Sequence, residues 1–455
     1  MRYGLTMTLL GMLPLTAVAE SSWETRGSIG FEKFMATDDE VSEEDRLIKD
    51  EVRLTLELVY AGDGYSLFMR PQLYGLLTPG EDRYRYRGEL KSYSNLTVSS
   101  EHYELSFPEL YYSRETDAYR LRIGNQIYNW GTADIINPTA WFNPIDYREI
   151  LFREPDEARE GVPSVSLLTY PGEWTFEMVL TVLPVTSKDP LYGDFWYPDF
   201  DNLPMEVYLA EGEDDPGNPG FGARLSTTLG STDFSFSAYR GPDKDLLLVP
   251  EETLITDTGE VGVRVRADTV PVTMVGMDVA HSIDRFVFQA EAAWSPDKQR
   301  VINQSRLAPQ DMAFPWEMDK GGWISWSTGF NYFIPMEKLI EDHQGDAVLT
   351  VEYLESRYED GGTAGGGLTA DFIGARIQDS YMENRLEVAL TAMQEKNGAG
   401  NLIWPWVGYR FDNGFRAGAS WVRVEAGDPG QNRLASLFYY IRKKDLLSLK
   451  LNYEF

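Results

Sequence analysis

The sequence contains no cysteine and only three histidines, His102, His281 and His343. Without cysteine the chain has neither disulfide bonds nor an N-terminal cysteine that could carry a lipid anchor. Three widely spaced histidines do not form the ligand pattern of a zinc site. The formal net charge of −31, from 41 basic and 72 acidic residues, argues against a nucleic-acid partner, because nucleic acid is also negative.

Long hydrophobic runs are missing as well. No stretch reaches about 18 consecutive apolar residues, so the sequence predicts no membrane-spanning helix. The N-terminus combines a basic Arg2, a short apolar run from Leu5 to Val18 and the small-residue pattern Ala17-Val18-Ala19. These are the three parts of a secretory signal. We therefore expect residues 1–19 to be a signal peptide that is removed on export.

The last nine residues alternate strictly between apolar and polar side chains. Leu447, Leu449, Leu451, Tyr453 and Phe455 alternate with polar residues, and this period of two places the two sets on opposite faces of a strand. Aromatic residues make up 13% of the chain although its mean hydropathy is −0.35. A barrel in which one face of each strand meets lipid and the other meets water has this composition.

The same alternation recurs along the chain between turn signals. The segments with this pattern are 23–35, 51–60, 65–76, 102–113, 118–128, 162–170, 174–184, 221–229, 233–240, 270–281, 285–294, 323–333, 347–358, 372–379, 384–393, 402–411, 415–424 and 447–455. Short and long connections alternate between them, as the periplasmic turns and external loops of outer-membrane barrels do. The sequence therefore predicts an all-β fold with residues 20–455 as a single domain. That domain is a transmembrane antiparallel β-barrel of about 18 strands, within a range of 14 to 18.

One face of the predicted strands carries charge. Phe288 and Leu390 belong to apolar sets that would face lipid, whereas the polar residues between them would face the interior. A barrel of about 18 strands is too wide to be filled by its own side chains and leaves an aqueous channel. The predicted charges of the lumen wall are Arg53, Arg120, Arg122, Arg224, Glu291, Glu387, Arg416 and Lys450. The alternative is that these charges only pair with one another.

The segment 129–160 combines many aromatic residues with dense charge. Because aromatic side chains favour burial, a loop of this composition is not expected to lie free in solvent. It follows the fifth predicted strand, where general porins carry a loop that folds inward. We therefore predict a constriction loop, with the narrow zone lined by Arg148, Arg153, Asp156, Glu157 and Arg159. The alternative is that the aromatic residues fix the segment to the wall and its charges merely pair.

Several short motifs resemble one family. They are Arg122-Ile-Gly-Asn-Gln126 with Trp130-Gly131, Asn143-Pro-Ile-Asp146, Phe221-Gly-Ala-Arg-Leu225, Val275-Gly-Met-Asp278 with Glu291-Ala-Ala-Trp294, and the terminal strand. In this order they are similar to domain-of-unknown-function family 1302, a porin-like family, over residues 118–455. The resemblance implies an outer-membrane barrel of a kind sometimes associated with uptake or export of hydrophobic compounds. It implies no catalytic residues.

The sequence shows no set of residues that would form a catalytic or cofactor site. His281 and Ser282 are adjacent, but consecutive strand residues point to opposite faces, so we predict no enzyme. The acidic runs at 38–40, 43–45 and 211–215 could collect Ca²⁺ weakly at the surface, or could simply be solvated. We expect no other metal and no cofactor.

These features predict a porin-like channel in the bacterial outer membrane for passive diffusion of small solutes, favouring cations or neutral molecules. Two alternatives stay open: a transporter of hydrophobic or amphipathic compounds, and a barrel that sheathes a periplasmic partner. The expected partners are outer-membrane lipid, small solutes and the barrel-assembly machinery, which would recognise the C-terminal strand. A homo-oligomer is also open.

Overall fold

The computed structural model describes residues 22–37, 47–77, 96–99, 103–135, 137–147, 157–188, 205–209, 219–255, 259, 261–302, 313–341, 343, 345–359, 371–396, 400–427, 438, 441–442 and 444–455. The predicted signal peptide at 1–19 lies outside these residues. In the described part of the chain, no helix is both long enough and apolar enough to cross a membrane.

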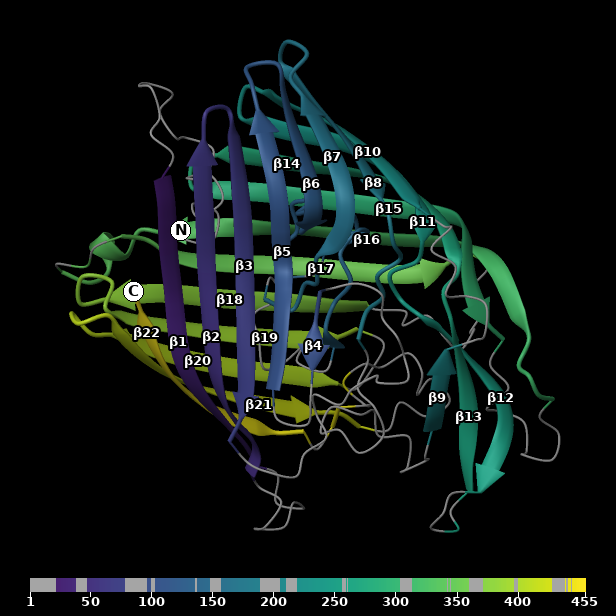
Figure 1. Ribbon diagram of the computed structural model, residues 1–455. Coiled ribbons are helices and arrows are strands. Elements are labelled where there is room, and N and C mark those ends of the chain that lie inside the picture. Colours follow the sequence, from purple (N-terminus) through teal and green to yellow (C-terminus); the bar gives the residue numbers. More distant parts are fainter. Residues whose placement is uncertain are drawn as a thin grey trace.

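Eighteen antiparallel strands form one closed barrel (Figure 1). The first nine are β1 (Ser22–Ala36), β2 (Leu47–Gly62), β3 (Tyr65–Leu76), β5 (Tyr103–Glu115), β6 (Tyr119–Gln126), β7 (Val162–Thr169), β8 (Trp174–Thr181), β10 (Gly220–Leu229) and β11 (Thr232–Pro242). The second nine are β14 (Pro271–Ile283), β15 (Phe286–Val301), β16 (Met318–Ile334), β17 (Ala347–Tyr358), β18 (Asp371–Tyr381), β19 (Leu386–Glu395), β20 (Asn401–Arg410), β21 (Phe415–Glu425) and β22 (Leu446–Glu454). All eighteen predicted strands are confirmed.

The first and last strands close the barrel. β1 pairs antiparallel with β22, and Ile29 stands opposite Tyr453. Beyond the ladder, the backbones of Gly27 and Phe455 exchange two hydrogen bonds of 2.9 Å. Every strand of the barrel therefore has a neighbour on both sides, as a strand surrounded by lipid requires.

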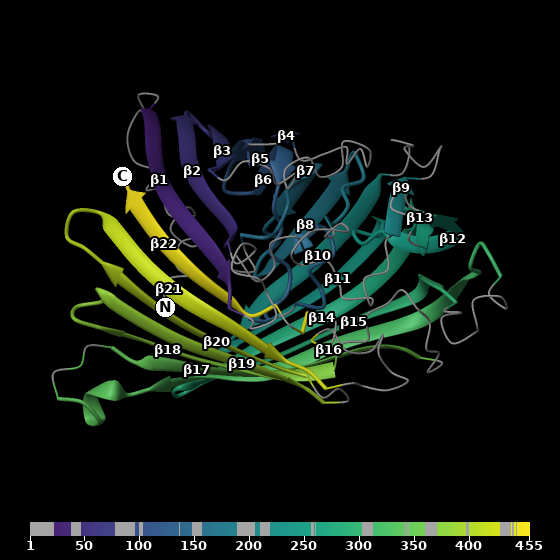
Figure 2. The same cartoon turned by 90° about the horizontal axis from the view of Figure 1, so that it is seen from below.

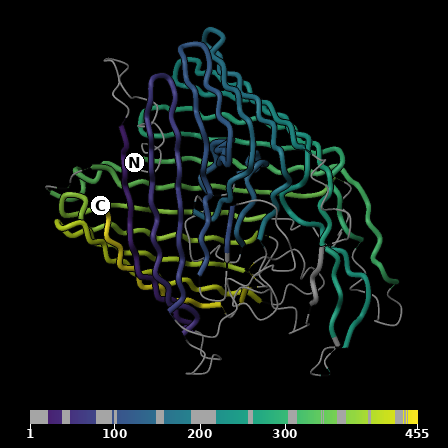
Figure 3. The backbone as a smooth tube through the Cα atoms, in the orientation of Figure 1, coloured from purple at the N-terminus to yellow at the C-terminus, as the bar shows by residue number. Residues whose placement is uncertain are grey.

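The strands are strongly tilted. In Figures 1 and 3, β1, β2 and β3 cross β15, β16 and β17 at a large angle, and Figure 2 shows these two groups on opposite sides of the barrel. Opposite walls of a closed barrel cross in this way because each strand is inclined to the barrel axis. The interior therefore lies between β1–β3 on one side and β16–β19 on the other.

The two faces of the wall differ as the alternation predicts. On β15, Phe288 leaves 46% of its surface exposed, whereas Glu291 on the opposite face leaves 3%. On β19, Leu390 is likewise exposed and Glu387 lies on the inner face. The outer face is thus apolar and the inner face carries the charge, which is the pattern of a barrel that spans a membrane.

Aromatic side chains gather near the end with the short turns. Trp23 and Tyr60 lie with ring centroids 5.1 Å apart, and Phe415 and Tyr453 lie 4.9 Å apart. The tight turns of this end use glycine where φ is positive, for example 72° at Gly64. A girdle of aromatic residues beside short turns marks the membrane–water interface of an outer-membrane barrel.

Three strands form a second, small sheet that stands apart from the barrel wall in Figure 1. They are β9 (Met205–Leu209), β12 (Leu247–Ile255) and β13 (Val261–Asp268), and β9 runs parallel to β13. The sequence predicted only loops between the strands at 174–184 and 221–229 and between those at 233–240 and 270–281, and this was wrong where β9, β12 and β13 lie. The alternation at 261–268 was visible, but period two does not distinguish a strand in the membrane from one outside it.

Two short elements complete the fold. β4 (Val98–Ser99) adds a two-residue bridge to β5, and η5 (Met336–Lys338) is a turn of 3₁₀ helix in the connection between β16 and β17.

Candidate functional site

Residues 127–161 connect β6 to β7, and we call them the connecting segment. The structure describes them except for residue 136 and residues 148–156. β6 is the fifth strand of the barrel, so the segment occupies the position that the sequence predicted for a constriction loop.

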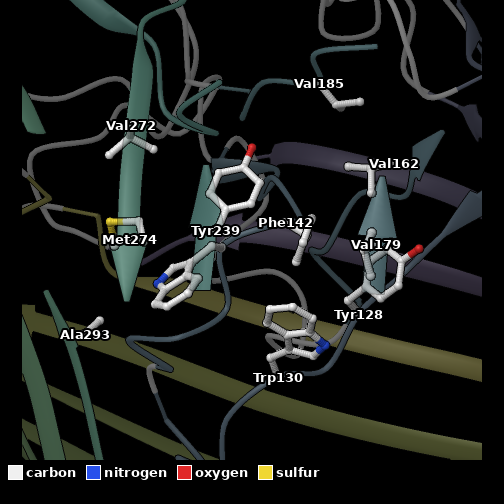
Figure 4. Close-up of a cluster of buried hydrophobic side chains, with 11 residues drawn as sticks. Tyr128, Trp130, Phe142, Val162, Val179, Val185, Tyr239, Val272, Met274 and Ala293 are labelled. Carbon is white, nitrogen blue, oxygen red and sulfur yellow. The ribbon is translucent and has the colours of Figure 1, made fainter. Parts of the chain in front are cut away.

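Aromatic side chains hold the base of the connecting segment (Figure 4). Phe142 lies between Tyr128 and Tyr239, with ring centroids 5.2 Å and 4.9 Å away. Trp130 meets Phe142 edge-on at 4.7 Å and is only 2% exposed. Its indole Nε1 donates a 2.9 Å hydrogen bond to Glu177 on β8. Trp130, Trp141 and Phe142 of the segment are thus buried, Tyr147 is half-buried, and Phe152 lies outside the described residues.

Asn143 ties the two ends of the connecting segment together. Its Nδ2 donates to the backbone oxygens of Gln126 at 3.1 Å and Glu160 at 2.8 Å. Its Oδ1 accepts a 2.6 Å hydrogen bond from the backbone N–H of Tyr128. Burial raises the pKa of the Tyr128 phenol, which stays protonated and bonds to Ser164 at 2.8 Å. The base of the segment is therefore well supplied with hydrogen bonds, as buried polar groups require.

The far part of the connecting segment lies against strands on another side of the barrel. Backbone N–H groups of Thr132 and Thr139 donate to Glu291 on β15 at 2.8 Å and 2.7 Å. The N–H of Asp134 donates to Glu352 on β17 at 2.9 Å. Both carboxylates lie on the inner face of the wall, because their strand neighbours face outward.

Glycines in the wall make room for the connecting segment. A Cβ atom on Gly222 would lie 2.3 Å from Cζ of Phe142, and one on Gly374 would lie 2.6 Å from Cδ1 of Ile135. Such distances are far below van der Waals contact, so any larger residue there would displace the segment. β10 and β18 therefore fit the segment by shape.

The predicted lining residues are only partly described. Arg148, Arg153 and Asp156 lie outside the described residues. Glu157 forms an ion pair of 3.0 Å with Arg53 on β2. Arg159 donates a hydrogen bond to the side chain of Asn129 within the segment. Glu157, a predicted lining residue, thus pairs with Arg53, a predicted wall charge, and the sequence did not indicate this pair.

The other predicted wall charges have the following contacts. Arg224 pairs with Asp278 at 3.4 Å, and Lys450 pairs with Glu32 at 3.5 Å. Arg416 bonds to Glu387. Arg122 lies 4.7 Å from the ring centroid of Tyr111, and Arg120 stands opposite Glu115 in the β5–β6 ladder. That these residues line a pathway for solutes stays a prediction.

The sequence analysis missed several residues that contact the connecting segment. Glu352, Glu177 and Asn143 carry the hydrogen bonds described above. The alternation places Glu352 and Glu177 on the inner face, and this signal was available. Nothing in the sequence indicates which inner residues meet the segment.

No catalytic arrangement surrounds the histidines that are described. His281 Nδ1 lies 2.7 Å from the Thr232 hydroxyl, at outward positions of two paired strands. His343 lies 3.1 Å from Asp379. His102 is outside the described residues, as are the acidic runs at 38–40, 43–45 and 211–215 that were considered for Ca²⁺. Among the described side chains, no group of three potential ligands converges on a metal position.

A closed barrel of eighteen antiparallel strands with an apolar outer face and a charged inner face defines a porin-like outer-membrane β-barrel. This protein therefore lies in the bacterial outer membrane, because its strands are fully paired and its outer face is apolar, as contact with lipid requires.

Solved structures of outer-membrane proteins align with this chain over nearly its whole length. Acinetobacter baumannii OccAB4 aligns over 96% of this chain and 98% of its own length, with a TM-score of 0.51 and 9% identity. Pseudomonas aeruginosa OccD3 aligns over 97% of this chain and 95% of its own, with a TM-score of 0.48 and 7% identity. Salmonella typhi OmpF, in complex with daunomycin, aligns over 95% and 97%, with a TM-score of 0.45 and 9% identity. At these identities the similarity concerns the fold alone.

No family model and no curated protein matches the sequence. The resemblance to family 1302 therefore stays a prediction.

Proposed function

We propose that this protein is an outer-membrane channel through which small solutes diffuse passively, and that the connecting segment narrows the passage. One observation carries the proposal: the segment is anchored near β8 and reaches carboxylates on the inner faces of β15 and β17. A barrel of about 18 strands leaves an aqueous interior unless something fills it. A segment that crosses part of this interior reduces its width.

The charge distribution supports a preference for cations or neutral solutes. The chain has a net charge of −31, and the inner-wall cations Arg53, Arg224 and Lys450 each contact a carboxylate. Paired basic residues add little net positive potential, whereas the overall negative field attracts cations. Selectivity then depends on ionic strength, because exposed charges are screened beyond about 8 Å at physiological salt.

Conductance in planar lipid bilayers tests this proposal. Folded protein, identified by its heat-modifiable migration in gels, should produce stepwise conductance, and a salt gradient should give a reversal potential that indicates cation preference. Folded protein that inserts without conductance would overturn the channel. A reversal potential of the opposite sign would overturn only the selectivity.

The remaining functional hypotheses make different predictions in the same system. A transporter of hydrophobic compounds would show low ion conductance with specific uptake of apolar solutes into liposomes. A sheath would co-purify with a periplasmic partner in fixed stoichiometry. Recognition of β22 by the assembly machinery and a homo-oligomeric state also stay proposals.

A further inference from the structure

We infer that Glu291 and Glu352 are positioning residues of the channel: their two carboxylates hold residues 132–135 and Thr139 of the connecting segment and so set the width of the passage. This inference rests on the proposed function. It assigns to the two acidic side chains the role of ligands for the protein's own backbone rather than for a solute.

Glu291 uses both of its carboxylate oxygens. Oε2 accepts from the backbone N–H groups of Thr132 at 2.8 Å and Ala133 at 3.2 Å. Oε1 accepts from the backbone N–H of Thr139 at 2.7 Å and from its hydroxyl at 3.0 Å. With four donors and 3% exposure, Glu291 has little capacity left to bind a passing ion.

Glu352 continues the same arrangement two strands away. Its Oε2 accepts from the backbone N–H groups of Asp134 at 2.9 Å and Ile135 at 3.2 Å. Four consecutive N–H groups of the segment, from residue 132 to residue 135, therefore point at two wall carboxylates. Successive N–H groups that point the same way form a concave site for an anion, and here the wall supplies the anions.

Side chains between the two carboxylates complete the attachment. Gln289 on β15 donates to the backbone oxygen of Thr132 at 2.6 Å. Asn331 on β16 donates to Oδ2 of Asp134 at 2.7 Å. The segment is thus bonded to β15, β16 and β17 in order, and each contact uses an inward side chain of the strand.

Carboxylates are suited to these two positions because the backbone N–H groups of the segment need hydrogen-bond acceptors. Residues 132–135 have no strand partner, so their partly buried N–H groups take acceptors from elsewhere. A carboxylate provides two acceptor oxygens, and hydrogen bonds to a charged acceptor are about twice as strong as neutral ones. A carboxamide offers one acceptor oxygen and turns a donor toward the other N–H groups.

The groups that face Glu291 are mostly acidic. Asp278 stands opposite Glu291 in the β14–β15 ladder, Asp134 belongs to the segment, and Glu352 on β17 accepts from the same segment. The cation Arg224 pairs with Asp278. Among the described residues Glu291 forms no ion pair with lysine or arginine. Acidification that protonates Glu291 therefore weakens the attachment.

Matched variants in planar bilayers test the inference. Glu291→Gln with Glu352→Gln should raise single-channel conductance and shift polymer exclusion to larger polyethylene glycols. The control is Glu387→Gln with Glu32→Gln, which removes the same number of charges from the inner faces of β19 and β1, at residues that bond to Arg416 and Lys450 and not to the segment. A double variant that behaves like this control would overturn the inference.

A rescue experiment separates positioning from a general structural defect. In Glu291→Ala, added formate can occupy the vacated site and accept the same N–H groups, so conductance should fall toward the wild-type value. Wild-type protein should not respond. A second readout is acid titration. The conductance of the wild-type channel should rise at low pH as the passage widens, and that of the double Gln variant should not change. Absence of both responses would refute the positioning role.

The two proposals can fail separately. If folded wild-type protein shows no conductance, the channel is refuted. Hydrogen exchange of residues 132–139 in the double Gln variant still reports whether the carboxylates hold the segment. If conductance is present but unaffected by the variants, only the positioning role is refuted.

Discussion

Phe142 is the residue whose truncation best isolates the attachment of the connecting segment. Its ring touches Tyr128, Trp130 and Tyr239, and 4% of the residue is exposed. Phe142→Ala removes this ring while the ends of the segment stay covalently joined to β6 and β7. We expect the substitution to destabilise the packing of the segment and to leave the stability of the barrel unchanged.

The magnitude follows from the packing. Phe→Ala in a core costs about 3–5 kcal/mol, and more when the surroundings cannot collapse. Gly222 lies directly against the ring, since a Cβ atom on it would be 2.3 Å from Cζ of Phe142. As a glycine it has no side chain that could move into the gap. We therefore expect the upper part of this range. At about 1.4 kcal/mol per tenfold change, opening of the segment becomes roughly a thousandfold to several thousandfold more frequent.

Hydrogen exchange measured by mass spectrometry is the assay. Peptides from residues 127–147 should exchange faster in Phe142→Ala, while strand peptides keep their protection. The matched control is Phe236→Ala on β11, which removes the same ring from the lipid-facing surface, where it is 53% exposed. Equal exchange of the segment in both variants would refute the reasoning, as would loss of protection throughout the barrel.

Two further predictions concern charged side chains. Lys49 and Glu51 form a fully buried ion pair of 2.8 Å on β2. Lys49→Met alone should destabilise the barrel by about 3–5 kcal/mol and so lower the temperature of the heat-modifiable gel shift. Lys49→Met with Glu51→Leu should largely restore this temperature, because both buried charges are then gone. An equal loss in both variants would contradict this. Burial lowers the pKa of Lys244, which donates to the backbone oxygen of Ala140 at 2.9 Å. Because the pKa of Lys244 is lower in the folded protein than in the unfolded chain, the stability of the barrel should rise with pH between the folded pKa and about 10.4. Lys244→Met should abolish this rise in the gel-shift temperature. An unchanged rise would show that another group causes it.

The barrel could be predicted because its signal is local. Period-two alternation in β22 and its seventeen counterparts depends only on neighbours in sequence, since each strand has to present one face to lipid and one to water. The same argument correctly placed Phe288 outward and Glu291 inward. Turn residues such as Gly64 set the boundaries.

The small sheet of β9, β12 and β13 could not be predicted in the same way. β9 pairs with β13 across more than fifty residues and runs parallel to it, so the alternation of neither strand reveals the other. The partners of single charges were also beyond the sequence. Arg53 was expected on the wall and Glu157 in the segment, but only the fold brought them to 3.0 Å.

The sequence by itself therefore determined the class of fold, the two faces of the barrel strands at residues such as Phe288 and Glu291, and the segment after the fifth strand as the place to look. Only the tertiary structure decided how that segment is held. Glu291 and Glu352 meet donors that are 152 and 218 residues away along the chain. Closing the barrel brings such distant residues together, and this contact depends on the curvature and tilt of the whole wall, which no local pattern encodes.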